Sequence, residues 1–273
     1  MKILLSIVLS AMALTLYSQS FKVMSYNIRL DVASDGVNQW SNRTEKLPAV
    51  IRKYDPDLVG LQEAMHHQLM DIRKALPQYG YIGVARDDGK EKGEYSAILY
   101  RKDRFEVLSQ KTSWLSETPD VPGSKSWDAA ITRVLTRGKF KDKKTGKEFM
   151  YFNTHFDHIG KEARKNSAGL IIKAIKDESK KLPVVVTGDF NSQITEDPYK
   201  VIVDSKVISD ARPDGSTQGT FCTFSVNGPP CTLIDYIFHS KNIKRQTYQV
   251  ITDNDGTYYP SDHLPVMAEF TFD

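Results

Sequence analysis

Two cycles of strand, helix and strand run through this sequence, one in each half of the chain. The first has an apolar segment at 21–29, a helical pattern that begins near Ser41, and a second apolar segment at 58–61. The second cycle repeats this order, with apolar segments at 149–155 and 182–186 around a longer helical pattern. Helices that fall between strands in this way are typical of α/β proteins.

Further short apolar segments lie between and after the two cycles. We expect strands at 79–84, 96–100, 105–114, 131–140, 233–238, 248–252 and 266–272, and further helices at 69–76 and 197–204. Several of these strands are close enough along the chain to pair as antiparallel hairpins. Two mixed sheets packed face to face, with helices on the outside, would bury all of these apolar faces.

The first twenty residues predict an export signal. Lys2 gives a short positive region, 3–16 is an apolar run, and the small residues Ser18 and Ser20 suit cleavage after position 20. An uncleaved membrane anchor is the alternative, but the run is shorter than the roughly 20 apolar residues that a spanning helix needs. We therefore expect an exported protein, periplasmic or extracellular, with no stable membrane insertion.

Residues 21–273 contain no linker-like stretch that would divide them, which favours one domain. The formal charge is +3, and loss of Lys2 with the signal brings it closer to neutral. This balance is unlike that of a strongly basic nucleic-acid coat, although a local basic cleft could still bind phosphate. The oligomeric state stays open.

Cys222 and Cys231 are the two cysteines of the chain. Because export takes a protein to an oxidising compartment, we expect a disulfide between them. The sequence Asn-Gly-Pro-Pro at 227–230 is typical of a turn that would bring the two sulfurs together. A metal site is the weaker alternative, since no companion cysteines or histidine pair completes a zinc pattern.

Polar side chains stand just past apolar segments at five places, where strands would deliver them to a sheet edge. These segments are Ser25-Tyr26-Asn27, Leu61-Gln62-Glu63, Asn153 to His158, Gly188-Asp189-Phe190-Asn191 and Ser261-Asp262-His263. A sixth segment, Leu233-Ile234-Asp235-Tyr236, has its acid inside the strand predicted at 233–238, where burial of a carboxylate is costly unless it is paired or bound to a metal. Any one segment is explained by a turn or a satisfied core group, but six in one chain favour a shared site.

The set is chemically coherent for hydrolysis of a phosphate ester. Glu63, Asp262 and the amide oxygen of Asn27 are hard oxygen ligands, which suit Mg²⁺ or Mn²⁺ rather than zinc. Such an ion neutralises phosphate charge while a base activates water. His263 is the natural base, and Asp235 could orient its ring.

Three other polar residues have expected roles in the same reaction. His155 and Asn191 can donate hydrogen bonds to phosphate oxygens. Asp189 could orient the water or bind a second ion, and these two roles stay open.

Taken in order, these motifs resemble the endonuclease/exonuclease/phosphatase superfamily over nearly the whole mature chain. The resemblance implies a deoxyribonuclease-like four-layer α/β/β/α sandwich of two mixed β-sheets flanked by helices. It also implies metal ligation by Glu63 with Asn27 and Asp262, a His263 and Asp235 dyad, and phosphate contacts from His155, Asp189 and Asn191. Either His263 or Asp189 could be the base. Segments 188–192 and 235–238 are most similar to the deadenylase-like branch and its secreted bacterial relatives.

Four further residues are candidates for substrate binding, namely Arg86, Glu94, Arg133 and His158. Arg86 could hold a phosphate with two hydrogen bonds, although a solvated turn explains it equally well. Arg133 interrupts a strand and would face either a phosphate or an acid. His158 would reach substrate or cap a helix.

Polar loops and tryptophans are weaker indicators of the site. The loops at 87–93, 117–128, 212–219 and 253–260 could rim it. Trp40, Trp114 and Trp127 could stack on a base or a sugar, but we expect at least two of them to be anchors in the fold.

The leading interpretation is therefore a secreted, metal-dependent phosphodiesterase, with RNA or DNA as the first choice of substrate. A phosphatase or phospholipase C-type hydrolase of inositol phosphates or sphingomyelin-like lipids is the alternative within the same chemistry. A non-catalytic binding module is the alternative from another class, but it would require a missing catalytic group, and none is missing.

Overall fold

The computed structural model describes residues 20–273, so the predicted signal, apart from its last residue, lies outside the described part. Within that part the chain forms two six-stranded sheets. In spatial order, the first contains β11 (Ile243–Val250), β12 (Val266–Phe272), β1 (Phe21–Asn27), β2 (Leu58–Gln62), β4 (Ile98–Arg101) and β3 (Tyr79–Ile82). The second contains β5 (Phe105–Trp114), β6 (Val134–Asp142), β7 (Glu148–His155), β8 (Val184–Asp189), β10 (Asp235–His239) and β9 (Ser209–Asp210).

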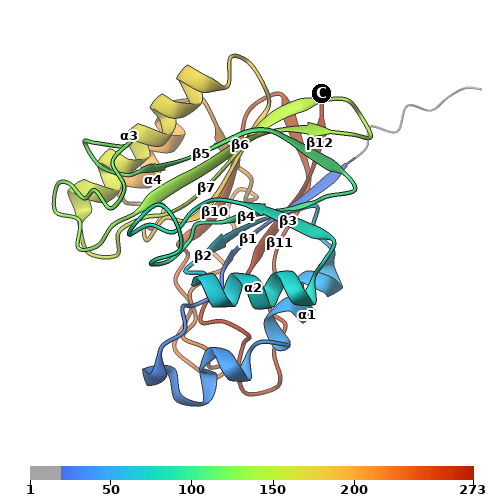
Figure 1. The fold of residues 1–273 in the computed structure, drawn as a ribbon, viewed down its shortest axis with the longest axis vertical. Helices are drawn as coiled ribbons and strands as arrows, with labels where there is room; N and C mark the ends of the chain where they lie inside the picture. The colour runs from blue at the N-terminus through green and yellow to red at the C-terminus, as the bar shows by residue number, and fades with distance from the viewer. Residues whose placement is uncertain (1–19) are drawn as a thin grey trace, which may run out of the picture.

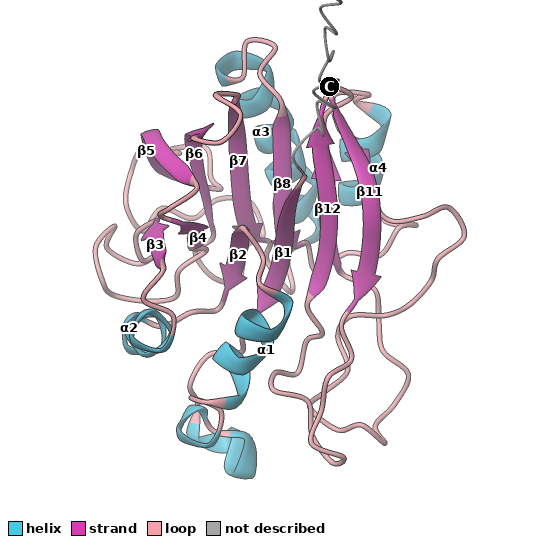
Figure 2. Cartoon of the chain, turned by 90° about the vertical axis from the view of Figure 1, so that its right-hand side faces the viewer, coloured by secondary structure: helices cyan, strands magenta, loops and turns pink. Residues whose placement is uncertain are grey.

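Both sheets are mixed, as expected. β1 and β2 pair in parallel, as do β7 and β8, whereas the other neighbours are antiparallel. Each parallel pair is connected through a helix, because two strands that point the same way need a long crossover. Figure 2 shows β1, β12 and β11 side by side in the first sheet.

Helices cover both outer faces of the sheet pair, with α1 and α2 on one side and α3 and α4 on the other (Figure 1). The α-helices are α1 (Lys46–Tyr54), α2 (His66–Ala75), α3 (Lys161–Glu178) and α4 (Asp197–Asp204), and two short 3₁₀ helices, η1 (Ala33–Asn38) and η2 (Trp40–Asn42), precede α1. None of the helices within residues 20–273 has the length and apolar character needed to span a bilayer.

Three apolar clusters lie between the four layers. Leu47 and Ile51 of α1 pack on Met24 and Val59 of the first sheet. A second cluster, rich in phenylalanine, fills the space between the sheets. A third joins Ile171 of α3 to the second sheet. The four-layer α/β/β/α sandwich is therefore confirmed, since each interface buries one predicted apolar face.

Several predicted boundaries differ from the structure; β6, for example, begins at Val134 and not at 131, so Arg133 precedes this strand instead of interrupting it. The strand expected at 233–238 begins at Asp235, so this acid starts β10 instead of interrupting it. The helix expected near Ser41 begins at Lys46, because η2 precedes it. The strand expected at 248–252 is the longer β11, whose outward residues are polar and whose bulge breaks the alternating pattern.

Candidate active site

The predicted site residues gather at one edge of the two sheets. Asn27 ends β1 opposite Gln62 at the end of β2. His155 ends β7 opposite Asp189 at the end of β8, and Asp235 begins β10 opposite the same Asp189. Because β10 is antiparallel to β8, its first residue reaches the edge where β8 ends. The two sheets are joined there by Asn27, whose Nδ2 donates to Oδ2 of Asp189 at 2.9 Å.

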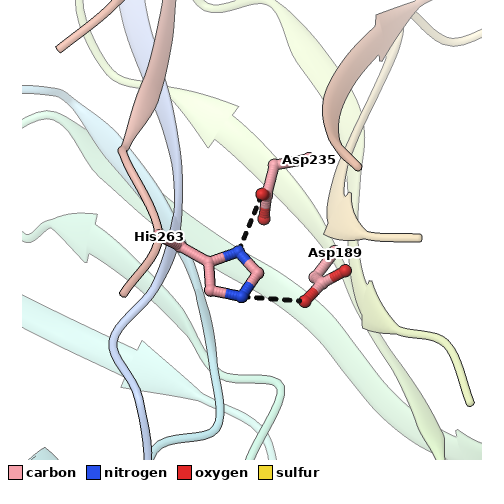
Figure 3. Close-up of side chains that lie close together, drawn as sticks. All are labelled: Asp189, Asp235 and His263. Carbon is pink, nitrogen blue, oxygen red and sulfur yellow. Dashed lines mark hydrogen bonds and ion pairs between the residues drawn. The ribbon is translucent and has the colours of Figure 1, made fainter. Parts of the chain in front are cut away.

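His263 lies between two buried carboxylates (Figure 3). Its Nδ1 atom is 2.8 Å from Oδ2 of Asp235, and its Nε2 atom is 3.7 Å from Oδ2 of Asp189. Burial alone would lower the pKa of His263, but the charges of Asp235 and Asp189 outweigh burial and raise that pKa to about 10. The imidazole is therefore protonated at neutral pH.

Asp189 is the carboxylate that contacts both sheets. Its Oδ1 atom accepts the backbone N–H of Asn191 at 2.9 Å, and its Oδ2 atom lies 3.4 Å from Nε2 of His155. Burial, followed by repulsion from Asp235, raises the pKa of Asp189 to about 7. This carboxyl group can therefore exchange a proton near neutral pH.

His155 and Asn191, the expected phosphate donors, contact each other. Nδ2 of Asn191 donates to Nε2 of His155 at 3.1 Å and to the carbonyl of Phe156 at 3.0 Å. Burial, followed by the positive charge of Arg133, holds the pKa of His155 well below its usual range, so the ring is neutral. A phosphate contact by Asn191 would replace one of these hydrogen bonds.

An acidic end of the site is formed by Glu63 and Asp262, with Arg29 near both. Oε1 of Glu63 accepts from Nδ2 of Asn27 at 3.0 Å, and its Oε2 lies 4.0 Å from Nη1 of Arg29. Nε of Arg29 is 3.8 Å from Oδ2 of Asp262 and 2.9 Å from Oδ2 of Asp35. Arg29 was not predicted, although it follows Asn27 by only two residues.

The acidic end fits a hard divalent ion. Burial raises the pKa of Asp262 against the opposing charge of His263, and repulsion from Glu63 adds to the rise. The pKa of Glu63 is lowered instead, because the charge of His263 and the hydrogen bonds from Leu30 and Asn27 outweigh burial. Arg29 approaches the oxygens of both carboxylates only at distances longer than a hydrogen bond, so it does not occupy them. Carboxylate oxygens in this position suit Mg²⁺ or Mn²⁺.

The fit of Asn27 as a metal ligand is weaker than expected. Its amide oxygen accepts the backbone N–H of Arg29 at 3.0 Å, and its amide nitrogen faces Glu63 and Asp189. An ion would reach the oxygen only if the amide turned over. Asp189, Asp235 and His263 form a second group whose ligand atoms are close enough to hold a metal, but Nδ1 of His263 is already bound to Asp235.

A basic end of the site lies around Arg133. Its Nη2 atom is 3.4 Å from Nδ1 of His158, and its Nη1 atom is 3.8 Å from Oε2 of Glu94. Arg133, His158 and Glu94 line the same cleft. Arg86 does not line it, because its guanidinium pairs with Glu94 at 2.7 Å on the buried side. The structure therefore brings together three of the four residues expected to bind substrate.

The cleft between these ends has a volume of about 400 Å³ and a partly apolar wall. Leu30, Ile131, Phe221 and Ile234 line it, and sequence reasoning missed all four. The Phe221 ring packs on the His263 ring with centroids 4.9 Å apart. Within residues 20–273, none of the four polar loops expected to rim the site contributes a lining residue.

The predicted disulfide between Cys222 and Cys231 is present in the structure. It closes a loop that contacts the site directly, because the backbone N–H of Cys222 donates to the carbonyl of Asp262 at 2.8 Å. Oγ1 of Thr220 accepts the backbone N–H of Asp235 at 3.1 Å. The disulfide loop thus supports Asp262, and Thr220, two residues before the loop, supports Asp235.

Comparison with known proteins identifies the family. A model described as the Endonuclease/Exonuclease/phosphatase family matches residues 24–263. The chain belongs to this family. Enzymes of the family are hydrolases that act on phosphate esters and use divalent metals, so the chain is assigned as a phosphate-ester hydrolase and the binding-module alternative is set aside.

Solved structures of the family are closely similar. A family protein of Bacteroides thetaiotaomicron is 42% identical, with a TM-score of 0.89, over 93% of this chain and 98% of its own. A mannosyl-6-phosphatase of the same organism is also 42% identical, with a TM-score of 0.87, over 92% of this chain and 100% of its own.

More distant relatives include nocturnin of Mus musculus. It is 24% identical over 92% of this chain and 65% of nocturnin, so this chain spans about two thirds of that protein. The predicted likeness to the deadenylase-like branch is confirmed by such relatives.

Proposed function

We propose that this protein is a divalent-metal-dependent phosphatase of small phosphomonoesters, with sugar phosphates as the substrate class. The observation that carries the proposal is the cleft, whose volume of about 400 Å³ suits a small molecule. Glu63 and Asp262 line it, Arg133 lines it as well, and part of its wall is apolar. A sugar phosphate has matching parts, because its phosphate group is charged and its ring has an apolar carbon face.

The 42% identity to a mannosyl-6-phosphatase supports the same class, since it is well above the 24% identity to nocturnin. Nucleic acid was the first choice of substrate from the sequence, and it is now the second choice after a sugar phosphate. Proteins that bind a single-stranded nucleic acid usually have a basic groove with several aromatic side chains, on which successive bases stack. Within residues 20–273, Phe221 is the one phenylalanine, tyrosine or tryptophan that lines the cleft.

The acidic end would hold the ion, with Glu63 and Asp262 as its carboxylate ligands. Such an ion, when bound, neutralises charge on the phosphate and on the leaving oxygen. Arg133 also lines the cleft and would bind a further oxygen of the same phosphate.

We assign the base to Asp189 and charge stabilisation to His263 with Asp235. A general base must be unprotonated before it accepts a proton from water. Asp189 has a pKa of about 7, whereas His263 has a pKa of about 10 and already carries a proton. His263 can instead donate to the phosphate while Asp235 balances its charge.

A substrate panel tests the proposal. Mannose 6-phosphate, glucose 6-phosphate, an aryl phosphodiester and oligoadenylate RNA are incubated with Mg²⁺ or Mn²⁺, and Asp189→Asn serves as the inactive control. We expect kcat/KM for a sugar phosphate to exceed that for the diester by about 100-fold or more. If the protein shortened the RNA and released no phosphate from mannose 6-phosphate or glucose 6-phosphate, it would be a nuclease and the proposal would be wrong.

We also propose that the protein is exported and that residues 1–20 are removed. The charge and apolar pattern of that segment support this. Amino-terminal sequencing of protein recovered outside the cytoplasm should begin at Phe21.

A further inference from the structure

A second cavity, about 520 Å³ in volume, lies between α3 and the second sheet. We call it the α3 groove, and it is lined by Trp114, Trp127, Leu135 and Leu170 together with charged side chains. Its walls come from β5, β6, α3 and the connection between β5 and β6. None of its lining residues belongs to the cleft described above.

Trp127 stands out among the residues of this groove. It is 36% exposed, whereas Trp114 is 5% exposed and donates its indole N–H to the carbonyl of Arg86. Trp127 also has a positive φ of 58°, a conformation that a large side chain rarely adopts. Burial does not explain why this ring is kept in that conformation.

The neighbours of Trp127 impose its conformation. Oγ of Ser126 accepts the backbone N–H of Glu117 at 3.0 Å. The carboxylate of Asp128 accepts the N–H of Ala163 at 2.7 Å and that of Glu162 at 3.2 Å at the start of α3. With both neighbours hydrogen-bonded, the backbone of Trp127 is held in this conformation beside the groove, and strain maintained in this way often marks a functional position.

Six of the seven charged side chains that line the groove pair with each other, and the seventh is the exposed Glu117. Lys111 pairs with Asp120 at 2.8 Å, and Arg137 pairs with Glu178 at 2.6 Å. A strongly charged ligand would have to break these pairs, whereas a neutral ligand with many hydroxyl groups can exchange hydrogen bonds with their outer atoms. The exposed indole offers an apolar face of the kind on which a sugar ring stacks.

We propose that the α3 groove is a carbohydrate-binding site, which takes an unphosphorylated oligosaccharide. The groove lies next to the cleft along the chain, because Ile131 lines the cleft only four residues after Trp127. Four residues span at most about 14 Å. The proposal rests on the proposed function for the choice of sugar, since the unphosphorylated part of a phosphorylated glycan would then bind in the groove.

Calorimetric titration with unphosphorylated mannotriose and maltotriose tests the proposal directly. We compare wild type with Trp127→Asn, because asparagine accepts a positive φ and removes the ring. Val121→Asn is the matched control, since Val121 is 52% exposed in the same connection and does not line the groove. We expect binding of at least one trisaccharide, weakened about tenfold or more by Trp127→Asn and unchanged by Val121→Asn.

Two further measurements separate this site from the active site and from a structural role. Hydrolysis of mannose 6-phosphate should be unchanged in both variants, and the melting temperature of Trp127→Asn should be equal to or above that of wild type. Wild type that binds neither trisaccharide, or Trp127→Asn that binds as tightly as wild type, would overturn the carbohydrate site. Trisaccharide binding that depends on Trp127, without hydrolysis of any sugar phosphate, would support the groove and reject the phosphatase assignment.

Discussion

Nδ1 of His263 lies 2.8 Å from Oδ2 of Asp235, and both side chains are buried. The other carboxylate oxygen of Asp235 accepts no hydrogen bond from any residue in 20–273. The imidazolium is therefore the principal partner of this charge. Removing one member leaves the other buried without its partner, so the two residues should behave as a unit.

The first prediction concerns that unit. We expect His263→Ala to reduce kcat on a sugar phosphate by about 10²- to 10⁴-fold, because its proton and charge act in the transition state. Asp235→Asn should cause a similar loss, and the double variant should cost little more than either single variant. Single losses that multiply in the double variant would show that the residues act independently. Melting curves of all three variants check that each is folded.

The second prediction concerns pH. Asp189 must be unprotonated to act as a base, and its pKa is raised to about 7, so kcat should fall as the pH drops below that value. Because the pKa of His263 is about 10, a second loss is expected when the imidazolium loses its proton near that pH. The dependence of kcat on pH, measured at saturating substrate, reports the pKa values of groups in the enzyme–substrate complex. It therefore avoids the ionisation of the free phosphate ester, which occurs near pH 6. An acid limb near pH 4 would remove Asp189 from the role of base.

The third prediction concerns the metal. Chelation should abolish activity, and Glu63→Gln should raise the Mg²⁺ concentration for half-maximal activity by about tenfold or more. Calorimetric titration with Mn²⁺ measures the ion directly and should show weaker binding to the variant. Glu106→Gln, on the exposed side of β5, is the matched control and should bind Mn²⁺ as wild type does. Equal Mn²⁺ affinity in wild type and Glu63→Gln would exclude Glu63 as a ligand.

Much of the site could be predicted because it lies where strands end. Asn27, His155 and Asp189 each follow an apolar run, and the sheet register then brings such ends together. The sequence predicted Asp235 inside a strand, because Leu233 and Ile234 before it are apolar. In the structure, the pairing of β10 with β8 begins only at Asp235. Local patterns therefore identified which residues meet, but not how each is oriented.

The residues that sequence reasoning missed depend on contacts between distant segments. Arg29 reaches Asp262, and Phe221, the residue before the disulfide loop, packs on His263. The protonation of His263 has the same origin, since Asp235 and Asp189 approach it from different strands. No spacing along the chain encodes these contacts, so the sequence alone left both His263 and Asp189 as candidates for the base.

The fourth prediction concerns the disulfide. A double Cys222→Ser and Cys231→Ser variant should lower the free energy of unfolding by about 2 to 3 kcal/mol, as expected for a closed loop of this length. KM should also rise, because Phe221 of the cleft precedes Cys222 and the backbone of Cys222 bonds to Asp262. Denaturant titration and steady-state kinetics measure the two effects. A reducing agent should lower the free energy of unfolding and raise KM in wild type, and it should change neither quantity in the variant. Wild type whose stability and KM do not respond to the reducing agent would contradict the prediction.

The last prediction concerns Asp157, a buried carboxylate that shapes the wall of the cleft. Its oxygens accept the backbone N–H groups of Ala130, Ile131, Ile159 and Gly160 at 2.7 to 3.2 Å. Burial alone would raise the pKa of Asp157, but these hydrogen bonds outweigh burial and lower it. The ionised carboxylate therefore ties the segment before β6 to the turn that leads into α3.

Asp157→Asn should lower the free energy of unfolding at pH 7 by about 2 kcal/mol, because the amide nitrogen cannot accept these hydrogen bonds. A lowered folded-state pKa gives stability that is present above the unfolded-state pKa and is lost as the pH falls through the folded value. The difference in the free energy of unfolding between wild type and Asp157→Asn should thus become smaller below about pH 4. Urea unfolding at pH 7 and pH 3 measures it, with Asp204→Asn, an exposed acid at the end of α4, as the matched control. A difference that persists unchanged at pH 3 would show that the charge of Asp157 does not hold this wall.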